Sequence, residues 1–151
     1  MNHGGKKSTI ELRTGINIPI AQLFGLYDSV NWIAYTNEEN RKDLDKAIRN
    51  SDYLVSAWDG EKLVGLARAL SDDVSIFYLQ DILVRPEHQG QGIGKQLLQK
   101  CLQRYQHVRS KILLTEDEER QRIFYEKLGY RDIRDLREVN LNVFVQIAGA
   151  E

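Results

Sequence analysis

Apolar residues recur at two different spacings along the chain, and the change of spacing predicts an alternation of strands and helices. Residues 8–14 alternate weakly between apolar and polar positions and predict a first strand. Residues 18–30 carry apolar side chains at helical spacing, with Pro19 where it suits a first helical turn. Residues 38–50 predict a second helix with a thin apolar stripe. The expected order is therefore a strand followed by two helices.

Three strands are predicted next, because residues 53–58, 63–70 and 75–84 alternate or run apolar over strand length. The first two are separated by a turn that begins with Asp59 and Gly60, a dipeptide favoured in tight hairpin turns. An acidic turn precedes the third. This region therefore predicts three consecutive antiparallel strands.

The last third of the sequence predicts helices and strands in alternation. Apolar residues recur at helical spacing over 93–105, and residues 111–115 form a short apolar run typical of a strand. A strand, a helix and a strand in this order form a crossover, which joins parallel strands. Residues 116–130 predict a further helix that Gly129 ends, and residues 139–147 alternate almost perfectly, which predicts a final strand.

Together these elements predict an α/β (α+β) fold with a mixed, mostly antiparallel sheet and helices on both faces. A chain of 151 residues is long enough for one compact domain with a real core. No repeat, low-complexity tract or linker divides it. We therefore expect a single domain over residues 8–148, preceded by a flexible N-terminus at residues 1–7.

The charge balance excludes several classes of partner. The chain has 21 Lys and Arg against 22 Asp and Glu, interspersed, so it lacks the basic surface of a nucleic-acid-binding protein. It has no apolar run of membrane-spanning length and no secretory signal. Cys101 has no Cys or His companion at ligand spacing and predicts neither a disulfide nor a metal site. These patterns favour a cytoplasmic protein that acts on small molecules, without a nucleic-acid or membrane partner.

The stretch PEHQGQGIGKQLL, residues 86–98, places Gly90, Gly92 and Gly94 at alternate positions before a predicted helix. The spacing fits neither the G-x-G-x-x-G dinucleotide motif nor the P-loop. Glycines nevertheless allow backbone N–H groups to converge, and a helix N-terminus adds a positive dipole. The stretch therefore predicts an anion site, most simply for a pyrophosphate, with Lys95 as a nearby charge. The alternative is a tight turn with Lys95 on a solvated face.

The same stretch resembles the signature of the GNAT superfamily of acyl-CoA-dependent N-acyltransferases, in which Q or R is followed by two residues, G, one residue, and G or A. Residues 89–94, QGQGIG, have this pattern. LQDILVRPEHQ at 79–89 is similar to the family's fourth strand, and FYEKLGY at 124–130 to a later helix-to-strand motif. LYDSVNWIAYT at 26–36 adds a similarity to the serotonin or arylalkylamine N-acetyltransferase subgroup. The resemblance implies a sheet splayed between its fourth and fifth strands.

The resemblance also implies that acetyl-CoA is the acetyl donor and that no metal is needed. Backbone N–H groups would bind the pyrophosphate, and the pantetheine arm would pair like a strand with main-chain groups of the fourth strand. The residues implied in donor binding are Ile82, Leu83, Val84, Gln89, Gly90, Gln91, Gly92, Ile93, Gly94, Lys95 and Tyr125.

Tyr125, in FYEKLGY, lies where the family has its general-acid tyrosine. A tyrosine of pKa about 10 is a weaker acid than a thiol of about 8.5, so full proton transfer to the leaving thiolate costs about 2 kcal/mol. Hydrogen bonding to the developing charge is therefore expected to be its larger role. The alternative is a tyrosine packed in the core beside Phe124.

Asp81 is the candidate proton acceptor, because a carboxylate in a mostly apolar strand is costly unless it is paired or used. The glutamate that many family members carry on this strand corresponds to Tyr78, so no base transfers directly. Asp81 could instead hold a hydrogen-bond network or bind a cationic substrate, and a water chain to Glu116 or Asp117 would also serve. Glu118 replaces an Asn that often helps to seat coenzyme A.

Tyr27, Trp32 and Tyr35 cluster in the segment that covers the acceptor groove in this family, and with Asp81 they would suit an aryl- or alkylamine. The alternative is that Trp32 and Tyr35 anchor a loop. We expect an N-acetyltransferase that acetylates a small-molecule primary amine by direct attack in a ternary complex. Acetylation of protein lysines or N-termini, and a non-catalytic acyl-CoA-binding regulatory module, remain open. The final strand could also pair across a homodimer.

Overall fold

The computed structural model describes residues 9–32 and 37–149. The chain divides into two compact units, of which the first ends at Leu114 and the second begins at Thr115. The first unit contains a five-stranded sheet, and the second contains a helix and an extended C-terminal segment. Within the described part of the chain, no helix is long and apolar enough to cross a bilayer.

The sheet of the first unit is mixed and mostly antiparallel, as the sequence predicts. Its strands follow one another in sequence order, and only the last pair, β4 with β5, is parallel. The hairpin at Asp59 and Gly60 and the crossover into the fifth strand are both confirmed. The strands are β1 (Ile10–Thr14), β2 (Tyr53–Asp59), β3 (Lys62–Ser71), β4 (Ile76–Val84) and β5 (Ser110–Leu113).

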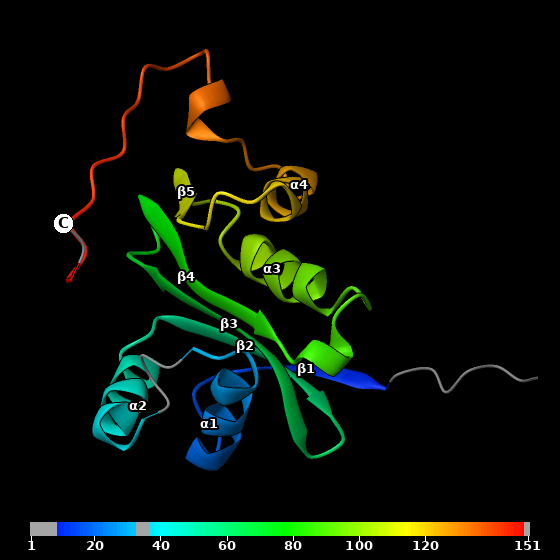
Figure 1. Ribbon diagram of the computed structural model, residues 1–151. Helices are drawn as coiled ribbons and strands as arrows, with labels where there is room; N and C mark the ends of the chain where they lie inside the picture. The colour runs from blue at the N-terminus through cyan, green and yellow to red at the C-terminus, as the bar shows by residue number, and fades with distance from the viewer. Residues whose placement is uncertain (1–8, 33–36, 150–151) are drawn as a thin grey trace, which may run out of the picture. The chain divides into compact units, whose positions relative to one another are not determined.

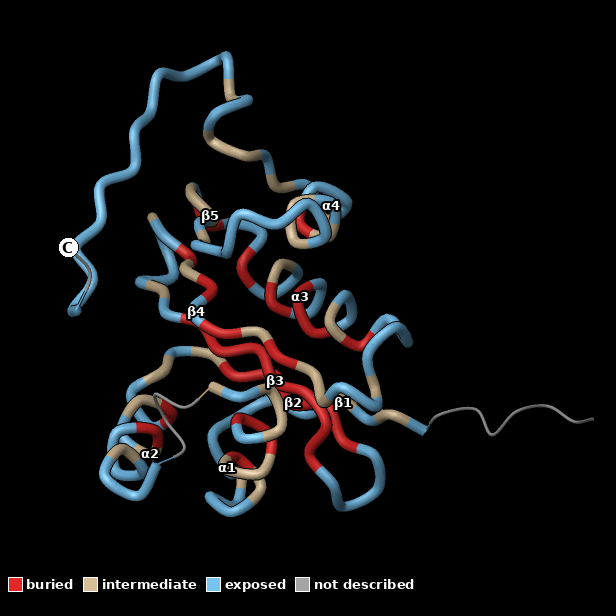
Figure 2. The backbone as a smooth tube through the Cα atoms, viewed as in Figure 1, coloured by how far each residue is buried: buried red, intermediate tan, exposed pale blue. Residues whose placement is uncertain are grey.

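Helices cover both faces of this sheet. Helices α1 (Ile20–Ser29) and α2 (Arg41–Arg49) lie on one face, and α3 (Ile93–Arg104) lies on the other (Figure 1). Two 3-10 turns, η1 (Glu38–Asn40) and η2 (Pro86–His88), precede α2 and α3. The buried residues concentrate on the central strands between the two helical layers (Figure 2).

The core brings α3 unusually close to the sheet at Gly65. A Cβ built on Gly65 would lie 3.2 Å from side-chain carbons of both Ile93 and Leu97. Both of these side chains are buried, so the first turns of α3 rest directly on β3. Because the glycine-rich stretch leads into α3, this contact helps to set its position above the sheet. Cys101 is fully buried on the same helix and burial raises its pKa to about 12, as expected of a packing residue.

The second unit confirms one predicted element and corrects another. Helix α4 (Glu119–Lys127) forms where the sequence predicts it, and Gly129 follows it with φ +93°; a 3-10 turn, η3 (Ile133–Asp135), comes next. The predicted strand at 139–147 is wrong: this described segment is not in a strand, and Phe144 is 90% exposed. Alternation suits a strand, but a strand also needs a ladder partner for its backbone groups, which this segment does not have. The homodimer stays a prediction.

Candidate functional site

Residues Gln89–Gly94, which we call the glycine loop, run from the end of η2 into the first turn of α3, where Gly94 lies. Gly90 and Gly92 have φ values of +81° and +79°, a backbone region that other residues rarely adopt. A Cβ added at either glycine would meet no atom within 4 Å, so these positions are restricted by their conformation and not by their neighbours. The Gln89 side chain donates a 3.0 Å hydrogen bond to the carbonyl of Val84 and ties the loop to the end of β4.

The N-terminus of α3 presents unused donors beside this loop. The first hydrogen bond within the helix joins the Gln96 N–H to the Gly92 carbonyl, and Gly92 supplies no side-chain cap. The N–H groups of residues 93–95 therefore lack intrahelical partners, and they lie at the positive end of the helix dipole. Ile93 is buried and anchors the turn, whereas Lys95 is exposed. This geometry suits an anion.

Strand β4 has two halves that differ in pairing. Its first half, Ile76–Leu79, pairs with β5 on one side and, from Phe77 onward, with β3 on the other. The pairing with β3 then shifts register, because Leu79 faces Ala69 whereas Asp81 faces Arg68, which leaves Gln80 as an extra residue, a β-bulge. From Gln80 to Val84, the side of β4 away from β3 has no strand partner in the described residues. We call this side the free edge.

The main-chain direction at the free edge follows from the ladder with β3. The Arg85 N–H donates a 2.8 Å hydrogen bond to the Val64 carbonyl. Main-chain groups alternate in direction along an antiparallel pair, so Asp81 and Leu83 also face β3, whereas Ile82 and Val84 face the free edge. The bond from Gln89 to the Val84 carbonyl agrees with this direction. Among the three predicted strand residues, Ile82 and Val84 thus direct their main-chain groups to the free edge, whereas Leu83 directs its groups to β3. The role of all three in donor binding stays a prediction.

The segment between β4 and the glycine loop is tied to the β2–β3 hairpin. The Arg85 Nε donates to the Leu63 carbonyl at 2.8 Å, and the Lys62 ammonium lies 3.4 Å from Glu87. His88 Nε2 lies 3.1 Å from a carboxylate oxygen of Asp59. These contacts hold the approach to the loop against a rigid hairpin.

Asp81 lies in a buried polar network on the α1 side of the sheet. It is 5% exposed, and its Oδ2 accepts hydrogen bonds from Arg68 Nε at 2.7 Å and from the Tyr27 hydroxyl at 2.8 Å. Arg68 is also 5% exposed, and its Nη1 reaches the Ser51 hydroxyl at 3.4 Å. Burial and the neighbouring Asp81 raise the pKa of Tyr27 well above its usual value. The network therefore joins α1, β3 and β4.

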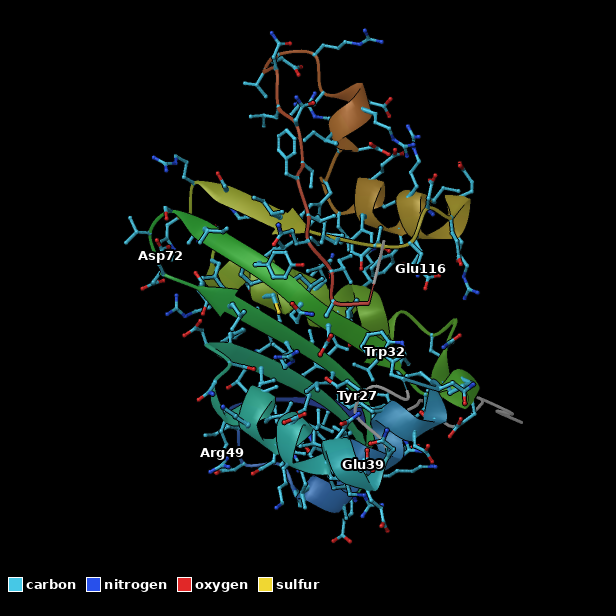
Figure 3. All side chains as sticks on the ribbon, turned by 60° about the vertical axis from the view of Figure 1, so that its left-hand side comes forward. Tyr27, Trp32, Glu39, Arg49, Asp72 and Glu116 are labelled. Carbon is cyan, nitrogen blue, oxygen red and sulfur yellow. The ribbon has the colours of Figure 1, made fainter. Side chains whose placement is uncertain are left out.

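Three of the four predicted acceptor residues meet around this network. The Tyr27 ring is fully buried, and Trp32 lies beside it with ring centroids 5.6 Å apart (Figure 3). The main-chain N–H of Trp32 also donates a 3.2 Å hydrogen bond to the Tyr27 carbonyl. Tyr35 lies outside the described residues. Sequence reasoning missed Arg68, whose signal was a single charge within the apolar run LVGLARAL.

In the second unit, Tyr125 is 8% exposed, and burial raises its pKa to about 12. Its ring contacts Phe124 and Tyr130 edge to face, with centroids 5.0 and 5.9 Å apart. Asp117, one of the alternative proton acceptors, forms a 3.3 Å ion pair with Arg134. Glu116 is exposed.

Comparison with known families decides the class of the protein. The model of the acetyltransferase (GNAT) domain matches residues 29–148. The chain belongs to the GNAT acetyltransferase family. Membership confirms the acetyltransferase interpretation of the sequence and makes acetyl-CoA the expected donor. The role of the glycine loop in donor binding and the serotonin-like subgroup stay predictions.

Curated relatives of this GNAT chain carry different names. A protein of Gibberella zeae named as an acetyltransferase is 38% identical over 56% of this chain and 46% of its own length. The uncharacterized N-acetyltransferase ycf52 of Pyropia yezoensis is 30% identical over 80% of this chain and 70% of its own length. The histone acetyltransferase TAP1 of Glycine max is 31% identical over 65% of this chain and 46% of its own length. The chain thus spans between about half and 70% of these relatives.

Solved structures agree with the GNAT fold. The GNAT-family acetyltransferase SP0256 of Streptococcus pneumoniae has a TM-score of 0.78 and 27% identity, with 93% of this chain and 99% of that chain covered. An aminoglycoside N-acetyltransferase in complex with CoA has a TM-score of 0.68 and 16% identity, with 95% and 98% covered. The second likeness shows the fold alone.

Proposed function

We propose that this GNAT chain transfers an acetyl group from acetyl-CoA to the primary amine of a small molecule. The observation that carries the proposal is the free edge of β4, which ends beside the glycine loop and the uncapped N-terminus of α3. A ligand with two amides followed by a pyrophosphate matches this order of groups. Acetyl-CoA has that order.

Donor binding is assigned mainly to main-chain groups. The N–H groups of residues 90–95 would bind the pyrophosphate, with Lys95 adding a charge, whereas the Gln89 N–H already donates to the Pro86 carbonyl at 3.3 Å. The pantetheine amides would pair with Ile82 and Val84 at the free edge, in the way that a further strand would. Substitutions at these positions would then affect donor affinity mainly through side-chain size and backbone conformation, and less through side-chain charge or polarity.

The reaction itself needs few groups, because the thioester is already activated. The neutral amine attacks the carbonyl carbon, the carbon–sulfur bond breaks, the amine loses a proton and the thiolate gains one. Tyr125 is proposed to serve the thiolate. With a pKa of about 12 it is about 3.5 units weaker as an acid than a thiol, so full transfer would cost about 5 kcal/mol. We therefore assign Tyr125 a hydrogen bond to the developing thiolate.

The acceptor of the amine proton is proposed to be a carboxylate. Asp81 stays a prediction in this role, but its side chain is buried and its Oδ2 already accepts from two donors. Accepting a proton there would break a buried ion pair. This geometry favours the alternative, a water chain that ends at an exposed carboxylate such as Glu116 or Asp117.

Two aromatic residues at the C-terminal end of α1 favour a small-molecule acceptor: Tyr27 lies in the last turns of the helix, and Trp32, which follows the helix, is half-buried beside it. An aromatic wall suits the apolar part of an aryl- or alkylamine. The aminoglycoside N-acetyltransferase shares this fold, and its name states a small amine as acceptor. The histone acetyltransferase named among the relatives favours a second candidate, a protein lysine. We further propose that residues 8–148 act as one catalytic domain, since the family model spans both units.

Donor binding is tested with Gly92→Glu, which adds strain and a negative charge to the glycine loop. The matched control is Gly60→Glu, because Gly60 also has a positive φ, of +62°, and open space around it, but lies in a hairpin turn. With folding checked by circular dichroism, we expect acetyl-CoA affinity to fall at least about 100-fold in Gly92→Glu and to change less than about threefold in the control. Normal binding by folded Gly92→Glu would refute the donor site.

The acceptor is tested by a turnover screen that detects free thiol released from acetyl-CoA. The panel contains arylamines, alkylamines, polyamines, amino acids and lysine peptides. We expect turnover with small amines to exceed turnover with peptides. Higher activity on peptides would support the lysine candidate, and binding of acetyl-CoA without thiol release from any amine would support a non-catalytic module.

A further inference from the structure

The ion pair between Arg68 and Asp81 lies directly beside the bulge of β4. The two residues are cross-strand partners, and Gln80, the extra residue, immediately precedes Asp81. Both side chains are 5% exposed and their closest atoms are 2.7 Å apart. A buried ion pair thus lies next to a register shift between β3 and β4.

Stability alone does not explain this pair. Removing two charges from water costs free energy that their attraction only partly returns, and well-packed apolar residues of similar size often stabilise a core as well or better. Buried polar pairs are best attested as devices that select one register among several. Beside Arg68, the ladder between β3 and β4 could form in more than one register.

The hydrophobic pattern after the bulge does not specify the register. Residues 82–84 are Ile, Leu and Val, so either face of the strand would be apolar if β4 slipped by one residue. In the slipped ladder, which continues the pairing of Leu79 with Ala69 without a bulge, Gln80 would face Arg68 and Asp81 would face Ala67. Asp81 would then lie away from Arg68 among apolar side chains, and an unpaired buried charge is costly.

The same slip would reverse the main-chain directions. Main-chain groups alternate along the ladder, so Ile82 and Val84 would turn toward β3. Asp81 and Leu83 would then face the free edge. The groups proposed to pair with pantetheine would be lost without any change in the glycine loop.

We infer that Arg68 is a positioning residue of the donor site: its buried ion pair with Asp81 fixes the register that directs Ile82 and Val84 to the free edge. The role in donor binding rests on the proposed function, but the role in register does not. Tyr27 adds a hydrogen bond to the same carboxylate and links α1 to this register.

Backbone amide hydrogen exchange measured by NMR tests the register directly. In the wild type without ligand, we expect the Asp81 and Leu83 amides to exchange at least about tenfold more slowly than those of Ile82 and Val84. In Arg68→Met combined with Asp81→Leu, which leaves no lone buried charge, the fold should persist. The difference between the amides of Ile82 and Leu83 should fall to less than about threefold, and acetyl-CoA affinity should weaken at least about tenfold.

Two single variants keep the inference testable if the double variant does not fold. Arg68→Lys retains a cation and should preserve the exchange pattern, whereas Arg68→Gln removes it and should lose the pattern. Tyr27→Phe is the control, because it removes a hydrogen bond to Asp81 but leaves the ion pair, and it should also preserve the pattern.

The outcomes separate the two proposals. An unchanged exchange pattern in the folded double variant, or in Arg68→Gln, would overturn the role of Arg68 even if acetyl-CoA binding weakened. The expected loss of pattern in a protein whose wild type does not bind acetyl-CoA would leave the register inference standing and refute the donor site.

Discussion

The glycine loop and the Arg68 network meet β4 in two different ways. In the proposed donor site, the loop would act through main-chain groups at an exposed surface, where Gly90 and Gly92 contribute conformation and no side chain. The network consists of three buried side chains, Tyr27, Arg68 and Asp81, in which the Asp81 carboxylate accepts hydrogen bonds from the other two. The glycine loop should therefore tolerate changes of side-chain charge or polarity that keep its backbone conformation, whereas the Arg68 network should not. If both proposals hold, a binding surface made of main-chain groups depends on buried side chains that set the direction of those groups.

The largest effect is expected from Arg68→Met, which leaves Asp81 buried beside Tyr27 without its cation. Breaking a buried ion pair in this way costs about 3–5 kcal/mol, so the free energy of unfolding should fall by that amount. Urea denaturation measures it. If the double variant Arg68→Met with Asp81→Leu were equally unstable, the loss would come from packing and not from the lone charge.

Tyr125→Phe tests a side chain that is proposed to act on the reacting thiolate and not on the position of the donor. Removing one hydrogen bond to a developing anion should lower kcat by about 30- to 100-fold, or about 2–2.7 kcal/mol in the barrier. Acetyl-CoA affinity should change much less.

The pH dependence of Tyr125 follows from the direction of its pKa shift. Burial raises the pKa to about 12, so below about pH 10 the phenol keeps its proton and can donate its hydrogen bond. The contribution of this shift to folding stability is likewise complete below the unfolded pKa of about 10 and is lost only as the pH rises toward 12. The ratio of wild-type to Tyr125→Phe turnover should therefore stay constant from about pH 6 to 9. A ratio that fell within this range, or unaffected turnover in the variant, would remove the assigned role.

Gly65→Val probes the packing that supports the glycine loop from below. The added carbons would meet Ile93 and Leu97, where even a Cβ lies within 3.2 Å, and overpacking of this kind costs about 1–3 kcal/mol. We expect thermal stability and acetyl-CoA affinity to fall together, and Gly65→Ala to have the same effects at smaller size. Weaker binding with unchanged stability would show that the loop does not depend on this contact.

The smallest effect is expected from Lys95→Gln, which changes charge at the loop but no backbone. An exposed charge contributes about 0.2–1 kcal/mol, so acetyl-CoA affinity should weaken by a factor between about 1.4 and 5. Titration calorimetry at two salt concentrations measures it. A loss as large as that of Gly92→Glu would show that a side chain, and not the main chain, dominates donor binding.

Patterns in the sequence predicted the features of the fold that depend on residues close together along the chain. Apolar spacing located the five strands and the four α-helices of the described residues, and alternate glycines located the loop. The bulge at Gln80 was not predictable, because residues 75–84 fit a regular strand, and the role of Arg68 needed its cross-strand partner. The segment 139–147 failed for the opposite reason: its alternation is local, but a strand requires a partner that periodicity does not supply.

The bulge at Gln80 has a consequence for how this sequence can diverge. The Gln80 side chain is exposed, so its replacement should be nearly neutral. Its deletion would keep Asp81 opposite Arg68 and keep both faces of the strand, yet it would remove the bend and let β4 continue alongside β5. Insertions and deletions at this position should therefore be tolerated less well than substitutions. Related sequences should keep the number of residues in β4 more strictly than the residue type at this position.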